Sequence, residues 1–83
     1  MEIIHDKYNN RFYAEVQGYT AYVDYEIWGD TLTIVTTQVP QPLSGQGIAA
    51  ALVKATYDYA SDESLKPAAT CSYAVAWLAR HTK

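Results

Sequence analysis

The sequence predicts an α+β domain in which an antiparallel β-meander precedes a helix, one further strand and a short C-terminal helix. Three observations predict this order. Apolar and polar residues alternate in the first half at the two-residue period of strands. Gly18 and Gly29 interrupt this alternation where turns are needed. After Pro42 a helical period replaces it. The chain has 83 residues, which is the size of one domain, so residues 1–83 are expected to fold together.

Three segments, 11–16, 19–28 and 32–39, are expected to form the strands of the meander, with residues 2–5 as a short edge strand. In segment 19–28 the apolar or aromatic residues that fall on one side are Tyr19, Ala21, Val23, Tyr25 and Ile27. That side is expected to face the core. His5 is expected at the surface.

The segment that begins at Ile48 predicts an amphipathic helix ending within residues 61–66. Its expected core face consists of Ile48, Ala51, Leu52, Ala55 and Tyr59, whereas Lys54, Asp58 and Asp62 fall elsewhere. Residues 67–71 are short and apolar enough for another strand, parallel to the third strand of the meander. Ser72 is then expected to cap a last helix over residues 73–80.

The charge balance argues against nucleic acid as a partner, because the net charge is −3 and the pI is about 5.1. Residues 1–41 carry most of the acidic side chains (Glu2, Asp6, Glu15, Asp24, Glu26 and Asp30 against Lys7 and Arg11). Such an acidic half suits a cationic acceptor, although ordinary variation in surface charge explains it equally well.

The lone cysteine excludes an internal disulfide and a cysteine zinc cluster. No spacing of His, Asp and Glu suggests a metal site. The chain starts without the basic and apolar pattern of a signal peptide and has no apolar stretch long enough for a membrane span. We therefore expect a cytoplasmic protein that does not bind membranes.

The loop around Gly45-Gln46-Gly47 is the strongest candidate for a ligand site. It follows a predicted strand and two prolines, and it opens the predicted helix. Glycines allow a ligand to approach the backbone closely, and the amides at a helix start attract phosphate oxygens. The sequence therefore predicts a pyrophosphate cradle built from the amides of residues 43–49. The alternative is a helix entry that merely needs an unusual backbone angle. No Lys-Ser/Thr follows Gly47, which excludes a Walker loop.

These segments resemble the short GNAT-like N-acetyltransferases, which are compact relatives of the acetyl-CoA-dependent superfamily. The resemblance covers nearly the whole chain. The match is loose over residues 11–13 and 22–25. It is close over residues 39–49 and at Leu52-Val53. The C-terminal part of the family pattern is matched by Cys71-Ser72-Tyr73 and by Arg80-His81. The resemblance implies a GNAT-like fold with a V-shaped opening between the strand ending at Val39 and the strand ending near Cys71. It also implies acetyl-CoA as cofactor, an amine that attacks the thioester directly, and a backbone amide near Val39 as oxyanion donor.

The cofactor-binding residues implied by the resemblance and the loop are Val39, Leu43, Ser44, Gly45, Gln46, Gly47, Ile48, Ala49, Arg80 and His81. Arg80 and His81 would face the phosphates, or else they belong to an exposed chain end. The superfamily carries Arg or Gln where this chain has Pro42. The short relatives carry His and Glu where it has Thr36 and Gln38, so two candidate bases are missing.

Tyr73 and Cys71 remain as catalytic candidates. By resemblance, Tyr73 would return a proton to the departing thiolate; otherwise it is a core aromatic. Cys71 would carry the acetyl group with His81 as its base, or it is a small buried residue. The acceptor is an unidentified amine, and the chain is expected to be a monomer or a homodimer. Two other functions stay open: a CoA-binding module without turnover, and a small structural domain that dimerises through aromatic residues such as Trp28.

Overall fold

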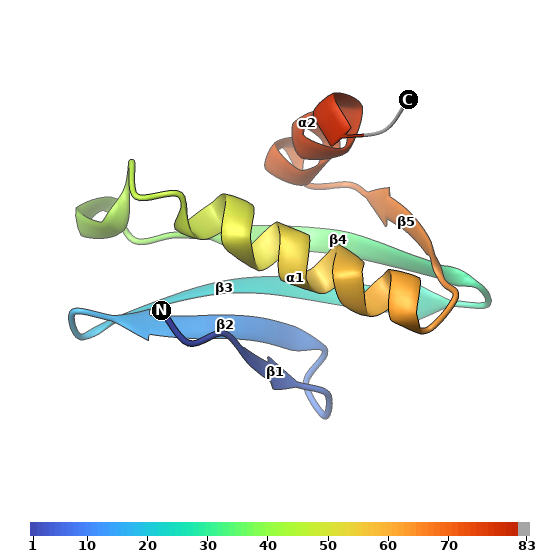
Figure 1. The fold of residues 1–83 in the computed structure, drawn as a ribbon, viewed down its shortest axis with the longest axis horizontal. Coiled ribbons are helices and arrows are strands. Elements are labelled where there is room, and N and C mark those ends of the chain that lie inside the picture. Colours follow the sequence, from blue (N-terminus) through green and yellow to red (C-terminus); the bar gives the residue numbers. More distant parts are fainter. Residues whose placement is uncertain (82–83) are drawn as a thin grey trace.

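The computed structural model describes residues 1–81, which form a five-stranded sheet and two α-helices (Figure 1). In chain order the elements are β1 (Ile4–Asp6), β2 (Arg11–Val16), β3 (Tyr19–Trp28), β4 (Thr31–Gln38), the 3-10 turn η1 (Gln41–Leu43), α1 (Ile48–Asp62), β5 (Lys66–Ala69) and α2 (Ser72–His81). The strands lie in the order β1-β2-β3-β4-β5, and only β4 and β5 pair in parallel. The predicted α+β architecture, including the parallel last strand, is confirmed.

The ends of several elements differ from the prediction because backbone hydrogen bonds, both local and between distant residues, define them. β5 begins at Lys66, whose amide donates to the Asp30 carbonyl over 2.7 Å, and it ends before Thr70. The predicted cap of α2 was one residue late, since the amide of Val75 donates to the carbonyl of Cys71 over 3.0 Å. Ser72 is therefore the first residue of α2, and Cys71 precedes it.

The helix α1 lies across one face of the sheet and buries a wider arc than the sequence predicts (Figure 1). Its buried residues are Ile48, Leu52, Val53, Thr56, Tyr57 and Ala60. Ala51, Ala55 and Tyr59 are only half-buried; Ala55 and Tyr59 still pack against the core, so the predicted face lies at its edge and not at its centre. The reason is that α1 contacts strands β2 to β4 as well as β5 and α2.

The core side of β3 was also only partly predicted. Ala21, Val23 and Tyr25 are buried, but Tyr19 and Ile27 remain 43% and 40% exposed. A strand of 10 residues spans about 33 Å, whereas a helix of 15 residues spans about 22 Å. The helix is therefore too short to cover both ends of β3.

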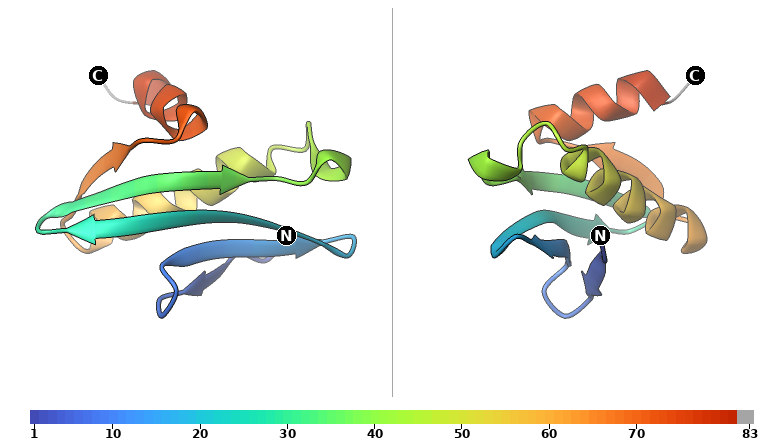
Figure 2. Two further views of the ribbon diagram at one scale, coloured as in Figure 1. Left: turned by 180° about the vertical axis from the view of Figure 1, so that it is seen from behind. Right: turned by 60° about the vertical axis from the view of Figure 1, so that its left-hand side comes forward.

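The opposite face of the sheet is not covered by any helix of residues 1–81 (Figure 2). We call it the outer face. By alternation with the buried residues, its side chains on β2 to β4 include Arg11, Tyr13, Glu15, Tyr22, Asp24, Glu26, Trp28, Thr36 and Gln38.

The sheet opens toward the carboxyl end of β4. The pairing of β3 with β4 shifts between Asp24 and Tyr25, which pair with Thr36 and Ile34, so Val35 is an extra residue in β4. Such a bulge bends a strand. The pairing of β4 with β5 stops at the same level, after Ile34 and Ala69. The two strands therefore pair only as far as Ile34 and Ala69, and the V-shaped opening expected between the residues that follow them stays a prediction.

His5 was predicted to lie at the surface, but it is half-buried and packs against aromatic rings. Its ring stacks on Phe12 with 3.9 Å between centroids and meets the Tyr59 ring edge-on at 4.4 Å. Its Nε2 lies 2.7 Å from the hydroxyl of Tyr25. Burial, followed by the charge of Lys7, lowers the pKa of His5. The cause is tertiary: β1 places His5 beside Phe12 on the face that α1 covers.

Neither of the helices formed by residues 1–81 has the length and apolar character that a membrane span requires.

Candidate functional site

A pocket of about 260 Å³ lies where β4 ends and α1 begins. Its lining comes from the residue after β4, from η1 and the loop that follows it, and from the first turns of α1 and α2. It consists of Val39, Leu43, Ser44, Gly45, Gly47, Ile48, Ala49, Ala50 and Tyr73. Most of the predicted cofactor-binding residues therefore surround one pocket. Of the predicted loop residues, Gln46 is exposed and is not part of the lining.

Both glycines of the loop adopt left-handed backbone conformations, with φ of 80° at Gly45 and 76° at Gly47. No atom lies within 4 Å of the position that a Cβ would occupy at either residue. The positive φ explains why glycine is favoured here, as the structural alternative supposed. The open space beside both residues also allows a ligand to approach the backbone.

The loop is held from beneath by η1 and Leu43. Pro40 and Gln41 supply the carbonyls that accept the amides of Leu43 at 2.9 Å and Ser44 at 3.0 Å. The Leu43 side chain is fully buried. The backbone that leads into the glycine loop is therefore anchored by two hydrogen bonds and one buried side chain.

The first turn of α1 contributes backbone amides, and therefore partial positive charge, to this pocket. Gly47 occupies the N-cap without a side-chain hydrogen bond, and the first turn contains no acidic residue. The first helical hydrogen bond runs from the amide of Ala51 to the carbonyl of Gly47, so the amides of Ile48, Ala49 and Ala50 have no acceptor within the helix. Amides at a helix start, with the helix dipole behind them, form an anion-binding site. Ala50 extends the predicted set by one residue.

Tyr73 lies in the first turn of α2 and lines the same pocket. It is half-buried and packs against the core. Tyr73 thus packs against the core on one part of its surface and lines the pocket with another.

Comparison with known proteins agrees with this site. The profile of the GCN5-related N-acetyl-transferase family matches residues 11–83. The chain belongs to this family. It is also similar to Protein NATD1 of Xenopus tropicalis, with 34% identity over 76 residues that cover 88% of this chain and 70% of NATD1. The predicted resemblance to the GNAT-like acetyltransferases is confirmed.

In this GNAT-related chain the structure does not bring Cys71 and His81 together. Cys71 precedes α2 and His81 ends it, so about 15 Å of helix axis separates them. The Cys71 thiol donates to the Thr37 hydroxyl, with 3.2 Å between Sγ and Oγ1. The Nδ1 of His81 lies 2.8 Å from the carbonyl oxygen of Trp77. The predicted cysteine–histidine pair is therefore not formed.

A second pocket, of about 460 Å³, lies between α1 and α2. It is lined by Ala50, Ala51, Lys54, Asp58, Trp77 and His81, and it shares Ala50 with the first pocket. The His81 ring stacks on Trp77 with 3.9 Å between centroids, and Arg80 is exposed beside it. Sequence reasoning does not single out Trp77 or Lys54, because only the packing of two separate helices makes them neighbours. Lys54 is engaged in an ion pair with Asp58 at 2.8 Å.

Among residues 1–81, no three or more His, Cys, Asp or Glu side chains are grouped closely enough to hold a metal ion.

Proposed function

We propose that this chain binds acetyl-CoA in the pocket at the end of β4 and transfers the acetyl group to an amine. The observation that carries the proposal is the convergence of the Gly45–Gly47 loop, the uncapped start of α1 and Tyr73 on one pocket. Membership of the N-acetyltransferase family supports the same activity.

The residues present fit a pyrophosphate. The amides of the glycine loop and of Ile48 and Ala49 can donate to phosphate oxygens, and no Cβ of Gly45 or Gly47 stands in the way. The pocket of about 260 Å³ is smaller than typical sites for whole cofactors. We therefore expect only part of CoA to be enclosed, while its nucleotide end lies outside, toward Arg80 and His81.

Acetyl-CoA supplies an activated thioester, and this chain supplies groups around the reacting carbonyl. In the proposed reaction the amine nitrogen forms a bond to the carbonyl carbon while the carbon–sulfur bond breaks. The amide near Val39 would donate to the carbonyl oxygen as negative charge develops on it. Tyr73 would donate its phenolic proton toward the departing sulfur. Thr36 and Gln38 are not basic, so the amine nitrogen would lose its proton to solvent, and Tyr73 would regain a proton from solvent after the thiol leaves.

Cys71 is a less suitable participant than Tyr73. It does not line the pocket, and its thiol donates to Thr37 rather than to a base. A nucleophilic cysteine needs a base or a positive charge that produces the thiolate. We therefore propose direct attack by the amine, with Cys71 as a structural residue.

A second candidate function is CoA binding without turnover. Thr36 and Gln38, both at the end of β4, favour it because neither can act as a base. A cytoplasmic location and a monomeric or homodimeric state remain predictions.

The first experiment is a thermal-shift series with acetyl-CoA, CoA and adenosine 3′,5′-bisphosphate. A ligand at about 100 times its Kd should stabilise the folded chain by roughly 2.7 kcal/mol. A shift with acetyl-CoA followed by CoA release with an amine panel would support the enzyme. A shift without CoA release on any amine would favour the binding module, and no shift with any of the three would refute both.

A further inference from the structure

The outer face has one row of aromatic side chains that leads toward the pocket. Tyr13 pairs in register with Tyr22, and Tyr22 pairs with Gln38. Gln38 is exposed and directly precedes Val39, which lines the first pocket. The row therefore runs across β2, β3 and β4 and ends beside the proposed site of acetyl transfer.

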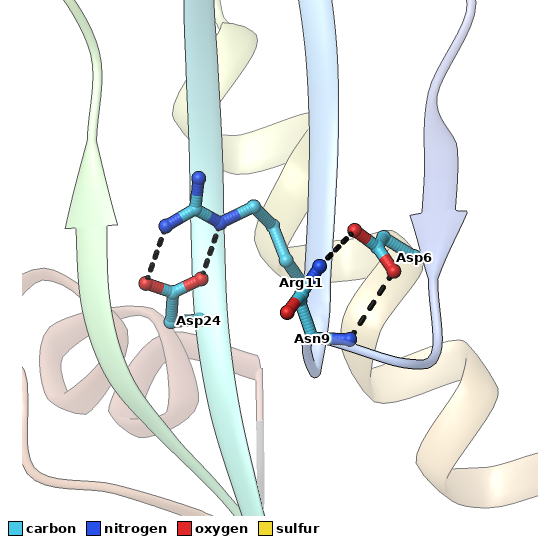
Figure 3. Close-up of polar contacts among 4 residues, drawn as sticks. All are labelled: Asp6, Asn9, Arg11 and Asp24. Carbon is cyan, nitrogen blue, oxygen red and sulfur yellow. Dashed lines mark hydrogen bonds and ion pairs between the residues drawn. The ribbon is translucent and has the colours of Figure 1, made fainter.

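The neighbouring row shows how this face holds a cation. The guanidinium of Arg11 donates from Nε and Nη2 to the two carboxylate oxygens of Asp24, at 2.6 and 3.0 Å (Figure 3). Its central carbon lies 3.8 Å from the centroid of the Tyr22 ring. A planar cation on the outer face is thus bound by a carboxylate and an aromatic ring at once.

The charge of the outer face is predominantly negative. Asp6 lies in register with Arg11 on its other side, and its carboxylate accepts hydrogen bonds from the backbone and side chain of Asn9 (Figure 3). Glu15 and Glu26 are exposed farther along the strands. At the β5 edge, Lys66 is paired with Asp30 at 3.4 Å. The carboxylates thus outnumber the one guanidinium of Arg11, and a basic partner complements this surface.

The shape of the outer face favours a large partner over a small one. Sites for small molecules are concave and enclose most of the ligand. Both pockets described above instead lie at the helices. A free amine on an open sheet would make few contacts, whereas an extended polypeptide can contact several strands. Trp28, which is 75% exposed, adds apolar area to the same face.

We propose that the outer face is the acceptor-docking surface and that the acceptor is a lysine within a basic, extended stretch of polypeptide. This inference rests on the proposed acetyl transfer for its catalytic meaning. Tyr13 and Tyr22 contact the acceptor polypeptide near its lysine, and Glu15 and Glu26 bind the cationic side chains that flank the lysine.

The test compares three probes: a flexible peptide with one lysine flanked by arginines, the same peptide with serines in place of the arginines, and free lysine amide. Binding is measured by calorimetry with the full chain and with two charge-matched variants. One variant carries E15Q and E26Q on the outer face. The other carries D62N and E63Q, both exposed at the far end of α1. The thermal shift with acetyl-CoA is measured for every variant.

We expect only the arginine-flanked peptide to bind, and E15Q/E26Q to weaken it on the order of tenfold. D62N/E63Q should leave its affinity within about twofold, since the charges lie away from the face. Equal weakening by both variants, equal binding of free lysine amide, or no binding of the peptide would overturn the inference. Peptide binding without any acetyl-CoA shift would leave the docking surface standing and refute the proposed acetyl transfer. An acetyl-CoA shift without peptide binding would refute the docking surface and leave the proposed acetyl transfer standing.

Discussion

The thiol of Cys71 donates to the hydroxyl of Thr37, with 3.2 Å between Sγ and Oγ1. Both residues lie beyond Ile34 and Ala69, the last residues at which β4 and β5 pair. This contact joins the last part of β4 to the residue that directly precedes α2. It gives the Cys71 side chain a structural role, because the contact ties the start of α2 to β4.

Replacement of Cys71 by alanine should therefore preserve acetyl transfer within about threefold, since direct attack needs no protein nucleophile. The loss of one weak hydrogen bond should lower the free energy of unfolding by at most about 1 kcal/mol. Steady-state CoA release and thermal unfolding measure both effects. Abolished transfer in a folded Cys71→Ala variant would instead establish an acetyl-cysteine intermediate.

Tyr73→Phe should slow acetyl transfer by about 100-fold while acetyl-CoA affinity changes little, because the phenol lines the pocket and acts as a proton donor only during the reaction. The rate is measured by CoA release and the affinity by thermal shift. Tyr8→Phe, at a position that is 95% exposed, is a suitable control for the effect of removing a hydroxyl. If Tyr73→Phe turns over at the wild-type rate, Tyr73 is a core aromatic alone.

Gly47→Ala should weaken acetyl-CoA binding at least about tenfold, because the new methyl group stands where phosphate approaches the amides. The matched control is Gly18→Ala, in the turn between β2 and β3. Its φ of 82° is close to the 76° of Gly47, and it too has no atom within 4 Å of a Cβ.

Both glycine variants should lose stability by a similar amount, on the order of 1–2 kcal/mol, since alanine is strained at such angles. Only Gly47→Ala should also show a smaller ligand-induced thermal shift than the wild type. Equal ligand shifts in the two variants would show that the glycine loop serves the fold and not a ligand.

His5 should make the stability of the chain sensitive to mild acid. Its pKa is lowered in the folded state, chiefly by burial, from the usual 6.5. The unfolded chain therefore takes up the proton first. The stabilisation from neutral His5 is fully present above pH 6.5 and is lost as the pH falls through the lowered pKa of the folded state.

Melting temperatures at pH 7.5 and 5.0 measure this effect. We expect the wild type to lose more stability over that interval than His5→Phe, which cannot be protonated and can keep the stack on Phe12. His81→Phe, at an exposed position, serves as the control for loss of a histidine. Identical pH dependence in the wild type and His5→Phe would show that protonation of His5 does not destabilise the fold.

Tyr57 connects α1 to β5 through its hydroxyl, which donates to the carbonyl oxygen of Ala68 at 2.6 Å. Burial raises the pKa of Tyr57 to about 12, so the phenol remains a donor at neutral pH. Tyr57→Phe should lower the free energy of unfolding by roughly 1–2 kcal/mol because the carbonyl loses its partner. Denaturant unfolding measures the change, and Tyr8→Phe is the control, because Tyr8 is 95% exposed. Equal stabilities of the two variants would contradict this role.

The sequence by itself determined the features that depend on neighbouring residues. The alternation from Arg11 to Val16, the turn at Gly18, the helix that begins at Ile48 and the glycine loop before it all follow from local periodicity and backbone preference. For the same reason the loop residues that line the first pocket could be named in advance, since they lie within a short stretch of chain.

Only the tertiary structure decided which distant residues meet. It stacked His5 on Phe12, placed Val53 and Thr56 in the core, and put Trp77 next to α1. It also separated Cys71 from His81 by the length of α2. Periodicity predicts that a helix or strand has an apolar side, but how much of that side is buried depends on what packs against it. The interactions of His5, Cys71 and His81 are therefore properties of the assembled sheet and helices and not of their local sequence.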